Sequence, residues 1–381
     1  MKLAIITSHP IQYNSPLFAL LANESKVDVM VFYTWGEASI NEKFDPDFQQ
    51  NFKWDIPLLT GYNYRFIKNT SPDPGSHHFK GIINPDLNQQ VEKWGADVVW
   101  IWGWSFDSHL KAIRYFKNKK EVWFRGDSTL LDESQHFNIK KILRRIFLKW
   151  VYSHIDKAFY VGTNNKEYFK KHGLNDSQLI YSPHAIDNCR FADPTGHYSI
   201  EAKKFRSKLN ITDDQKVILF SGKLETKKNP FFMFQLLKQL PLGKFVLLIV
   251  GSGPLENELK EKAPRNCIFL GFQNQSKMPI IYRMADLFVL PSIGPGESWG
   301  LSINEALACG IKVIASNKCG GAVDMLTNTL GYILSTPISI NPHLIEYLYD
   351  INKEPINPQE LKEKLDTHSY KTTIHSVLKS I

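Results

Sequence analysis

Cysteine is scarce in this chain, which has only four in 381 residues: Cys189, Cys267, Cys309 and Cys319. No two of them form a C-x-x-C pair, and their spacing does not match a zinc site. The sequence therefore excludes a disulfide scaffold and a zinc-finger protein. Such cysteine usage is typical of a reducing compartment, so we expect a cytoplasmic location.

Long hydrophobic runs are also missing. No window approaches the ~18 consecutive apolar residues that a membrane-spanning helix needs. The apolar run within residues 1–13 is too short for a secretory signal peptide. The sequence therefore predicts a protein that is soluble or peripheral to a membrane.

A third absence concerns the first βαβ unit. The expected strands at residues 3–7 and 27–33 enclose a helical pattern, which is typical of a nucleotide-binding domain. However, the first strand is not followed by G-x-G-x-x-G, and this argues against a dinucleotide-binding protein.

Length and charge set broad limits on the fold and the partners. At ~150 residues per domain, the chain has room for two domains, or for three. Its net charge of +8 and pI near 9.0 favour anionic partners such as nucleotides, phosphorylated lipids, acidic membranes or nucleic acid. The basic residues lack the interleaved aromatic platforms that bind single strands, so we expect no nucleic-acid partner.

The most informative stretch is residues 285–324. It begins with an apolar strand at 287–290 and continues into a Gly/Pro loop at 293–300. A short helix from 302 to about 308 and a second apolar run at 313–315 follow. This order predicts a crossover in a parallel sheet.

Two carboxylates frame that loop, with seven residues between Glu297 and Glu305. Glu297 lies in the loop and Glu305 in the expected first helical turn, so both can face a crevice at the carboxyl end of the strand. The backbone N–H groups of Gly300, Leu301 and Ser302 at the helix start suit an anion. Alternatively, Ser302 and Glu305 form a capping box, in which Glu305 only satisfies backbone donors.

An E-x7-E pattern after a strand that ends in Leu-Pro-Ser resembles the retaining glycosyltransferases of family 4. The resemblance implies an α/β fold of the GT-B type, with two Rossmann-like domains facing a central cleft. It also implies that Glu297 lies beside the donor sugar and that Glu305 holds the ribose hydroxyls of the nucleotide.

Further segments extend the resemblance. Residues 221–230, after the expected strand 217–220, are similar to the G-[RK]-L-x3-K segment that binds the donor diphosphate, with Lys223 and Lys228 at its two basic positions. Fixed cations there would stabilise the charge of a departing nucleoside diphosphate. Taken alone, lysines in a turn are usually solvated, but their place just after a strand favours a binding site.

Two glycines and one phenylalanine complete the expected donor side. Gly251 and Gly253, after the expected strand 245–250, resemble the VGxGP turn beside the nucleotide. Phe272 ends another strand and leads into a loop that members of the family use to hold the base.

The amino-terminal part carries weaker indications. His9, Gln12 and Tyr13 belong to an HPIQY segment, which resembles the opening of a subgroup of family 4 and implies a catalytic His9 near the donor phosphates or the acceptor. The alternative is a capped loop histidine. In the resemblance, Arg125 and Asp127 correspond roughly to a loop that members of the family use near the reacting centre, often with a histidine. Because the residues differ here, an internal salt bridge is an equal interpretation.

Residues 36–85 are aromatic-rich and irregular, and we interpret them as an acceptor-side lid. Asp45-Pro46-Asp47 matches a D-x-D motif of metal-dependent glycosyltransferases, but no apolar strand precedes it. We therefore predict no metal site.

Residues 139–155 form an expected basic amphipathic helix with Ile142, Ile146 and Trp150 spaced by four. Such a helix suits an anionic membrane surface. The alternative is a crossover helix that covers the sheet and keeps its basic side solvated, and the two interpretations can coexist.

The expected domain organisation follows from these segments. Residues 1–187 form an acceptor-side Rossmann-like domain, closed by a turn at 183–187 that resembles the PNGVD turn of the family. The polar stretch 188–212 is a linker, 213–355 is the donor-binding domain, and helices within 356–381 return to the first domain.

The expected function is retaining, metal-independent transfer of a hexose-type sugar from a nucleotide-diphosphate sugar. The acceptor would be a glycan or a lipid-linked glycan in cell-envelope polysaccharide synthesis, on the cytoplasmic side and peripheral to the membrane. No cofactor is expected, because the nucleotide sugar is a substrate. The alternatives are a nucleotide-sugar epimerase or phosphorylase on the same architecture, and a catalytically silent, membrane-associated binding protein.

Overall fold

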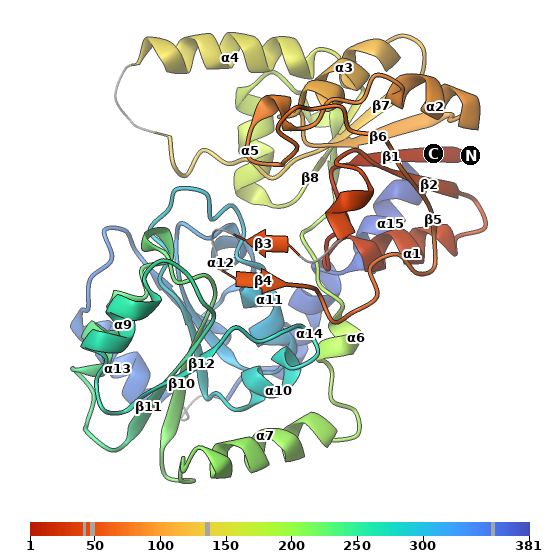
Figure 1. Ribbon diagram of the computed structural model, residues 1–381. Coiled ribbons are helices and arrows are strands. Elements are labelled where there is room, and N and C mark those ends of the chain that lie inside the picture. Colours follow the sequence, from red (N-terminus) through yellow and green to blue (C-terminus); the bar gives the residue numbers. More distant parts are fainter. Residues whose placement is uncertain (41–42, 46–49, 134–137, 352–354) are drawn as a thin grey trace. The chain divides into compact units, whose positions relative to one another are not determined.

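The computed structural model describes the chain except for residues 41–42, 46–49, 134–137 and 352–354, and for 43–45 and 50–52 it describes the backbone alone (Figure 1). The chain divides into two compact units. Unit 1 comprises Met1–Asn41, Pro57–His184 and Tyr370–Ile381, and unit 2 comprises Glu42–Ile56 and Ala185–Ser369. Among the described helices, none combines the length and the apolar character needed to cross a bilayer.

Unit 1 is built on a seven-stranded parallel sheet with the strand order β5-β2-β1-β6-β7-β8-β9. Its strands are β1 (Lys2–Thr7), β2 (Asp28–Tyr33), β5 (Asn63–Phe66), β6 (Val98–Trp102), β7 (Glu121–Arg125), β8 (Lys157–Tyr160) and β9 (Leu179–Tyr181). Its helices, with 3-10 turns marked η, are α1 (Ser15–Ala22), η1 (Glu37–Ile40), η2 (Phe79–Gly81), α2 (Leu87–Trp94), α3 (Asp107–Phe116), α4 (Ile139–Tyr152), α5 (Thr163–Lys171), η3 (Asp176–Gln178) and α15 (Tyr370–Lys379).

Unit 2 contains a six-stranded parallel sheet with the order β12-β11-β10-β13-β14-β15 and a separate antiparallel pair, β3 and β4. Its strands are β3 (Lys43–Asp45), β4 (Gln50–Phe52), β10 (Lys216–Ser221), β11 (Phe245–Val250), β12 (Cys267–Gly271), β13 (Leu287–Leu290), β14 (Lys312–Ser316) and β15 (Gly331–Leu334). Its helices are α6 (Asn188–Phe191), α7 (His197–Lys208), η4 (Thr226–Lys228), α8 (Phe231–Leu237), α9 (Glu256–Lys262), α10 (Met278–Arg283), α11 (Leu301–Ala308), α12 (Gly320–Met325), α13 (Pro342–Asp350) and α14 (Pro358–Thr367).

The central strands of both sheets are runs of apolar residues because helices cover both faces. In β1, Leu3, Ala4, Ile5 and Ile6 have no exposed surface, and every residue of β11 is buried. A strand buried on both faces cannot alternate apolar and polar residues. This explains why these strands could be located from short apolar runs alone.

Each sheet reverses its strand order at one point. In unit 1, β2 and β5 lie on one side of β1 and β6 to β9 on the other. In unit 2, β11 and β12 lie on one side of β10, and β13 to β15 on the other. In open α/β sheets, ligands bind beyond the carboxyl ends of the strands at such a reversal. The loops after β10 and β13 are therefore the first place to look for a site in unit 2.

The division into units differs from the sequence interpretation in three respects. The boundary falls between His184 and Ala185 and not at 187, and the segment Glu42–Ile56 belongs to unit 2. Residues 188–212 contain α6 and α7, and α7 packs on α10, so most of the expected linker is part of unit 2. Its polar composition hid these helices, since α7 buries only Ala202.

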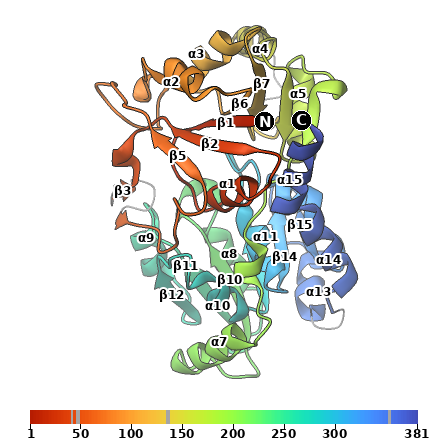
Figure 2. The same cartoon turned by 90° about the vertical axis from the view of Figure 1, so that its right-hand side faces the viewer.

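The last helices also divide between the units. α14 belongs to unit 2, whereas α15 belongs to unit 1 and packs on α1 and β9 (Figure 2). Tyr370 Oη donates a hydrogen bond of 2.9 Å to the backbone oxygen of Tyr13, and Lys157 Nζ donates one of 2.6 Å to the backbone oxygen of Ser380. Of the expected returning segment 356–381, the structure therefore assigns α15 to the first unit.

Candidate active site

The carboxyl ends of β10 and β13 bring together a lysine and a glutamate that the sequence analysis singled out. Lys228 ends η4, which follows β10, and Glu297 lies in the loop after β13. Lys228 Nζ forms an ion pair with Glu297 Oε2, and Ser292 Oγ donates a hydrogen bond of 3.1 Å to the same oxygen. Both side chains are largely buried, with 17% and 10% of their surface exposed. The carboxylate is therefore held in place at the reversal point of the sheet.

Backbone contacts fix the loops that carry this pair. Ile293 N donates to the oxygen of Lys227 at 2.9 Å, which joins the loop after β13 to η4. Leu224 N donates to the oxygen of Ser252 at 2.9 Å, which joins the loop after β10 to the loop after β11. Lys223 directly precedes Leu224 in the loop after β10. The three loops thus form one connected surface at the carboxyl edge of the sheet.

Gly251 is required for this close approach. A Cβ atom at this position would lie 1.9 Å from the backbone oxygen of Gly222, and the residue has a φ of +131°. Only glycine tolerates both the contact and the dihedral angle. Gly253, also with positive φ, is buried in the same turn.

Helix α11 starts differently from the sequence expectation. It begins at Leu301 with Gly300 as N-cap (φ +85°), and no side chain caps it. The capping box of Ser302 and Glu305 is therefore not formed, and Glu305 lies beyond the first turn. The first N–H groups of a helix have no partner within it, so those of Leu301 and Ser302 remain suitable for an anion.

Glu305 is buried, with 3% of its surface exposed, and accepts a hydrogen bond of 2.8 Å from Tyr282 Oη of α10. The sequence analysis missed Tyr282, because its helix reads as core and nothing in the spacing connects it to α11. A second missed contact is the 2.8 Å hydrogen bond from Trp299 Nε1 to Asn304 Oδ1, which anchors the loop to the same helix.

Gly320 and Gly321, the first two residues of α12, allow this helix to contact the loop closely. Gly321 N donates to the backbone oxygen of Trp299 at 2.9 Å. A Cβ at Gly320 would lie 2.5 Å from the oxygen of Ser298. Both glycines permit contact between α12 and the backbone that leads into α11.

Phe272, after β12, contacts the segment that the sequence analysis interpreted as a lid. Its ring centroid lies 6.3 Å from that of Trp54, and Asp55 Oδ1 accepts a hydrogen bond of 3.1 Å from Ser276 N. Trp54 and Asp55 thus pack against the loop after β12 within unit 2. Of the D-x-D segment, Pro46 and Asp47 lie outside the described residues.

The candidate residues of unit 1 follow β1 and β7. His9 Nδ1 is 2.9 Å from Ser8 Oγ, and the ring packs edge-on against Trp35. Gln12 is buried, and Tyr13 is tied through its backbone oxygen to Tyr370. These residues occupy the carboxyl end of β1, where unit 1 reverses its strand order.

The guanidinium of Arg125 contacts backbone oxygens and an aromatic ring of unit 1. Its Nη1 donates to the oxygen of Ser182 at 2.7 Å, its Nη2 to the oxygen of Pro183 at 3.2 Å, and its guanidinium lies 4.8 Å from the Trp102 ring. Burial lowers the pKa of Arg125 to about 10. The side chain therefore anchors the 182–183 turn through carbonyl groups.

Asp127 is half exposed and lies 3.7 Å from His184 Nε2. Burial lowers the pKa of His184, while Asp127 acts in the opposite direction. The carboxylate therefore faces the end of the same turn that Arg125 anchors.

One histidine that the sequence analysis did not single out is fully buried in unit 1. His109 Nε2 lies 2.8 Å from Thr34 Oγ1, and its Nδ1 lies 3.0 Å from the oxygen of Gly103. Burial lowers its pKa to about 4. A neutral, hydrogen-bonded imidazole joins the ends of β2 and β6.

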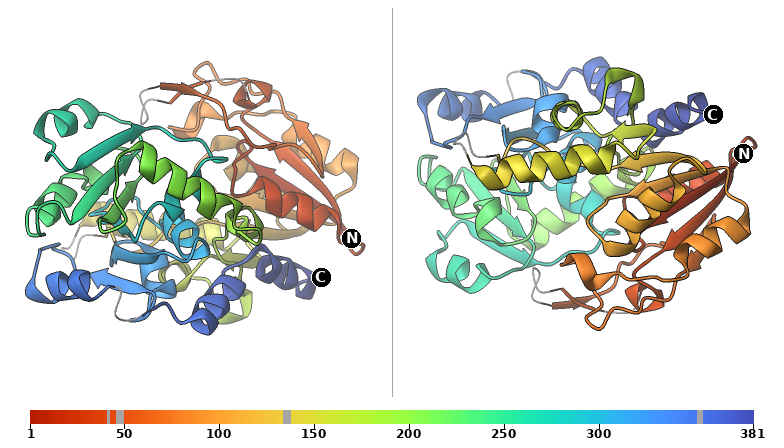
Figure 3. Two further views of the ribbon diagram at one scale, coloured as in Figure 1. Left: turned by 90° about the horizontal axis from the view of Figure 1, so that it is seen from below. Right: turned by 90° about the horizontal axis from the view of Figure 1, so that it is seen from above.

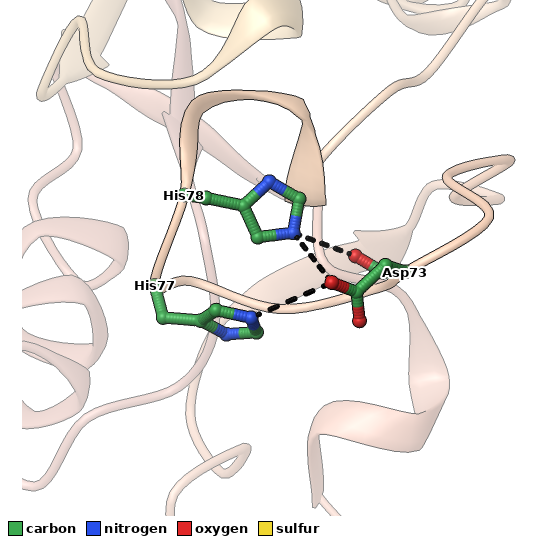
Figure 4. Close-up of side chains that lie close together, drawn as sticks. All are labelled: Asp73, His77 and His78. Atoms are coloured by element: carbon green, nitrogen blue, oxygen red, sulfur yellow. Dashed lines mark hydrogen bonds and ion pairs between the residues drawn. The ribbon is translucent and has the colours of Figure 1, made fainter.

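Asp73, His77 and His78 form a cluster that could hold a metal ion (Figure 4). One ligand atom from each lies within 4.8 Å of the others. Asp73 Oδ2 is 3.1 Å from His78 Nε2 and 3.7 Å from His77 Nε2. Asp73 and His77 are largely exposed, and the pairing of the acid with two imidazoles accounts for the arrangement without an ion.

Comparisons with known proteins agree with this architecture. Residues 201–368 match the family described as glycosyl transferases group 1. The chain is 31% identical over 162 residues to lipopolysaccharide 1,2-N-acetylglucosaminetransferase of Salmonella typhimurium, covering 39% of this chain and 41% of that protein. It is 33% identical over 177 residues to alpha-monoglucosyldiacylglycerol synthase of Streptococcus pneumoniae, covering 40% and 39%. The chain thus spans about two fifths of the length of these curated relatives.

The structural likeness extends over the whole chain. The crystal structure of Alr3699/HepE from Anabaena in complex with UDP and glucose is similar with a TM-score of 0.69, at 16% sequence identity, over 100% of this chain and 99% of that one. At this identity the likeness defines the fold. The chain therefore has the GT-B fold, and its residues 201–368 are similar in sequence to glycosyl transferases group 1.

Proposed function

We propose that this protein is a glycosyltransferase that takes its sugar from a nucleotide-diphosphate sugar bound to unit 2. The observation behind the proposal is the pairing of Lys228 with Glu297 at the reversal point of the sheet. A cation beside a carboxylate that accepts hydrogen bonds suits a ligand that carries both a diphosphate and sugar hydroxyls. Alr3699/HepE, which shares the fold, holds UDP and glucose in its crystal structure.

In this proposal, the residues have distinct roles. Lys223, Lys228 and the first N–H groups of α11 bind the diphosphate, and Glu297 orients the sugar hydroxyls. Glu305, oriented by the hydrogen bond from Tyr282, accepts hydrogen bonds from the ribose hydroxyls. Gly251 and Gly253 let the backbone approach the nucleotide, and Phe272 borders the base.

The proposed reaction is transfer with retained anomeric configuration. The bond between the anomeric carbon and the diphosphate oxygen breaks, and a bond from that carbon to the acceptor oxygen forms on the same face. The acceptor proton passes to the departing phosphate oxygen. Lys223 and Lys228 stabilise the charge that develops on the diphosphate, so no metal ion is needed. His9 is a candidate to contact the donor phosphates or the acceptor.

The acceptor class is inferred from the relatives and from the net charge. One relative is a lipopolysaccharide glycosyltransferase, and the other is a synthase of a glycosyl diacylglycerol. We propose a glycan or lipid-linked acceptor of the cell envelope, with the protein in the cytoplasm on the inner face of the membrane.

A donor screen tests this function. Each of a set of nucleotide-diphosphate sugars is added to the full-length chain, and the melting temperature is recorded. A ligand at a hundred times its Kd stabilises the folded state by about 2.7 kcal/mol, so the true donor should raise the melting temperature. The donor found is then incubated with envelope glycolipid extracts. A sugar-bearing product supports the transferase, whereas turnover of the donor to an epimer without an acceptor points to an epimerase. Absence of any donor effect would contradict the proposal.

A further inference from the structure

Helix α4 exposes an unusual amount of apolar surface. Ile139, Leu143 and Ile146 are 67%, 62% and 61% exposed. Three further apolar side chains of the helix are also exposed: Ile142, Phe147 and Trp150. A single exposed apolar residue is ordinary on a protein surface, but six on one helix of 14 residues require an explanation.

The exposed apolar residues lie opposite the face that packs on unit 1. At about 100° per residue, Ile139, Leu143, Ile146 and Trp150 point to one side of the helix. Leu148, Val151 and Tyr152 point to the other side and join the core beneath β7 and β8. The predicted stripe of Ile142, Ile146 and Trp150 therefore does not cover the sheet. Leu148, Val151 and Tyr152, in the last turns of α4, cover it instead.

Figure 3 (right) shows α4 in yellow along the surface of unit 1, with no described segment of that unit drawn over it. Phe147 and Trp150 are in tilted ring contact with centroids 5.6 Å apart, and Phe147 also contacts Trp104 at 5.5 Å. The aromatic end of the stripe is thus positioned by its neighbours, although it remains exposed.

Cations flank the stripe, and the helix contains no acidic residue. Lys140 and Lys149 are exposed on the two sides of the apolar stripe, and the Arg114 guanidinium lies 5.3 Å from the Trp150 ring. Arg144 is exposed as well, but its Nη2 donates a hydrogen bond of 3.4 Å to Tyr168 Oη of unit 1. The remaining two basic residues of the helix, Lys141 and Arg145, turn inward and pair with Glu133 at 3.2 and 3.3 Å. The outer side of α4 therefore combines an apolar stripe with a positive border.

We propose that the outer face of α4 docks on an anionic phospholipid bilayer. A helix that lies in the membrane interface buries its apolar residues just below the headgroups and keeps its cations at the level of the lipid phosphates. Tryptophan favours this boundary because its ring is amphipathic. The positive border selects an anionic lipid over a neutral one. The inference rests on α4 alone and does not depend on the sugar-transfer reaction.

Vesicle flotation of the full-length protein tests the inference. We expect binding to vesicles of phosphatidylcholine and phosphatidylglycerol, weak binding to phosphatidylcholine alone, and weaker binding at high salt. The double variant Leu143→Glu, Ile146→Glu should partition into vesicles about 100-fold more weakly. Two apolar side chains that would be buried in the lipid are replaced by charged ones. Replacing Lys140 and Lys149 by alanine should cost about fivefold per residue on anionic vesicles.

The matched control is Ile200→Glu, Leu242→Glu, which changes two exposed apolar residues of unit 2 that are 54% and 86% exposed. This control should bind anionic vesicles like the unchanged protein. Because all the changed residues are exposed, melting temperatures should stay equal, and donor-induced stabilisation should persist in every variant.

Equal partitioning of the α4 variant and the control would overturn the proposal, as would equal binding to neutral and anionic vesicles. A lipid-free dimer, measured by analytical ultracentrifugation, that dissociates in the Leu143→Glu, Ile146→Glu variant would also overturn it. In that case the occupant of the α4 face would be a second copy of the chain.

Discussion

At the scale of single residues, the account depends on Glu297 and its two partners. Its Oε2 atom receives both the ammonium group of Lys228 and the hydroxyl of Ser292. The change Glu297→Gln keeps the shape but removes the charge that orients Lys228 and the sugar. We expect kcat to fall by about 100- to 1,000-fold, the usual cost of losing one preorganised electrostatic contact. Initial rates at saturating donor measure this effect.

The matched control is Glu256→Gln on α9, where Glu256 pairs with Lys260 at 2.7 Å on the surface of the same unit. Rates of this control should equal those of the unchanged enzyme. If Glu297→Gln retained full kcat while the fold was intact, Glu297 would have no part in the reaction.

His109 predicts a pH dependence of stability. Burial lowers its pKa from 6.5 to about 4, so the folded protein binds fewer protons than the unfolded chain between these pH values. Stability is therefore complete above about pH 6.5 and is lost as the pH falls toward 4. From this residue alone, the free energy of unfolding should drop by about 2 kcal/mol between pH 7 and pH 5.

Urea unfolding at several pH values checks this prediction. The variant His109→Gln, which keeps hydrogen-bonding groups near Thr34 and Gly103 but cannot titrate, should show a shallower decrease. Burial lowers the pKa of His172, His184 and His368 in the same direction, so a part of the decrease should remain in the variant. An identical pH profile for both proteins would show that His109 does not carry the effect.

At the scale of elements, the turns after the strands of unit 2 are the most constrained. Gly251→Ala should destabilise the protein by at least ~3 kcal/mol, because backbone strain adds to a clash of the new Cβ with the oxygen of Gly222. Gly243→Ala is the matched control: its φ is also positive, at +83°, but no atom lies within 4 Å of the new Cβ. It should cost only about 1 kcal/mol. Equal melting temperatures for the two variants would contradict the close approach of the two turns.

The elements also show how far sequence reasoning reaches. Strands such as β11 and β13 could be predicted, because burial on both faces requires apolar runs. The edge strand β5 was missed, because most of its residues are exposed and it lies within the segment 36–85 that we interpreted as irregular. Lys228 and Glu297 could be placed at the carboxyl edge of the sheet, because both follow apolar strands. α6 and α7 could not be predicted, because α6 has only four residues and α7 buries Ala202 alone, so neither shows an apolar period.

Other features depended on contacts between distant segments. Glu305 matched a capping box by local spacing, but its partner is Tyr282, which only the packing of α10 on α11 brings near. The apolar period of α4 was evident, whereas the side to which it points was not. The pairing of Trp54 with Phe272 joins residues more than two hundred positions apart, and no local pattern reveals it.

At the scale of the whole molecule, metal independence is a testable expectation. Transfer should proceed at an unchanged rate in excess EDTA, because lysines rather than a divalent ion stabilise the leaving diphosphate. The double variant His77→Ala, His78→Ala removes two ligands of the exposed Asp73 cluster and should also keep the rate. Loss of activity in EDTA that divalent ions restore would refute this expectation. If the double variant lost activity as well, the Asp73 cluster would be the required metal site.

The central claim is that unit 2 holds a nucleotide-diphosphate sugar through cations at the reversal point of its sheet. Isothermal titration of the donor into Lys228→Ala measures it most directly, with Lys227→Ala as the neighbouring control, since Lys227 pairs with Glu225 at 3.1 Å. Lys228→Ala should bind about 10- to 100-fold more weakly, as expected for the loss of a charged hydrogen bond, while Lys227→Ala should bind normally. Unchanged affinity in Lys228→Ala, or an equal loss in both variants, would contradict the claim.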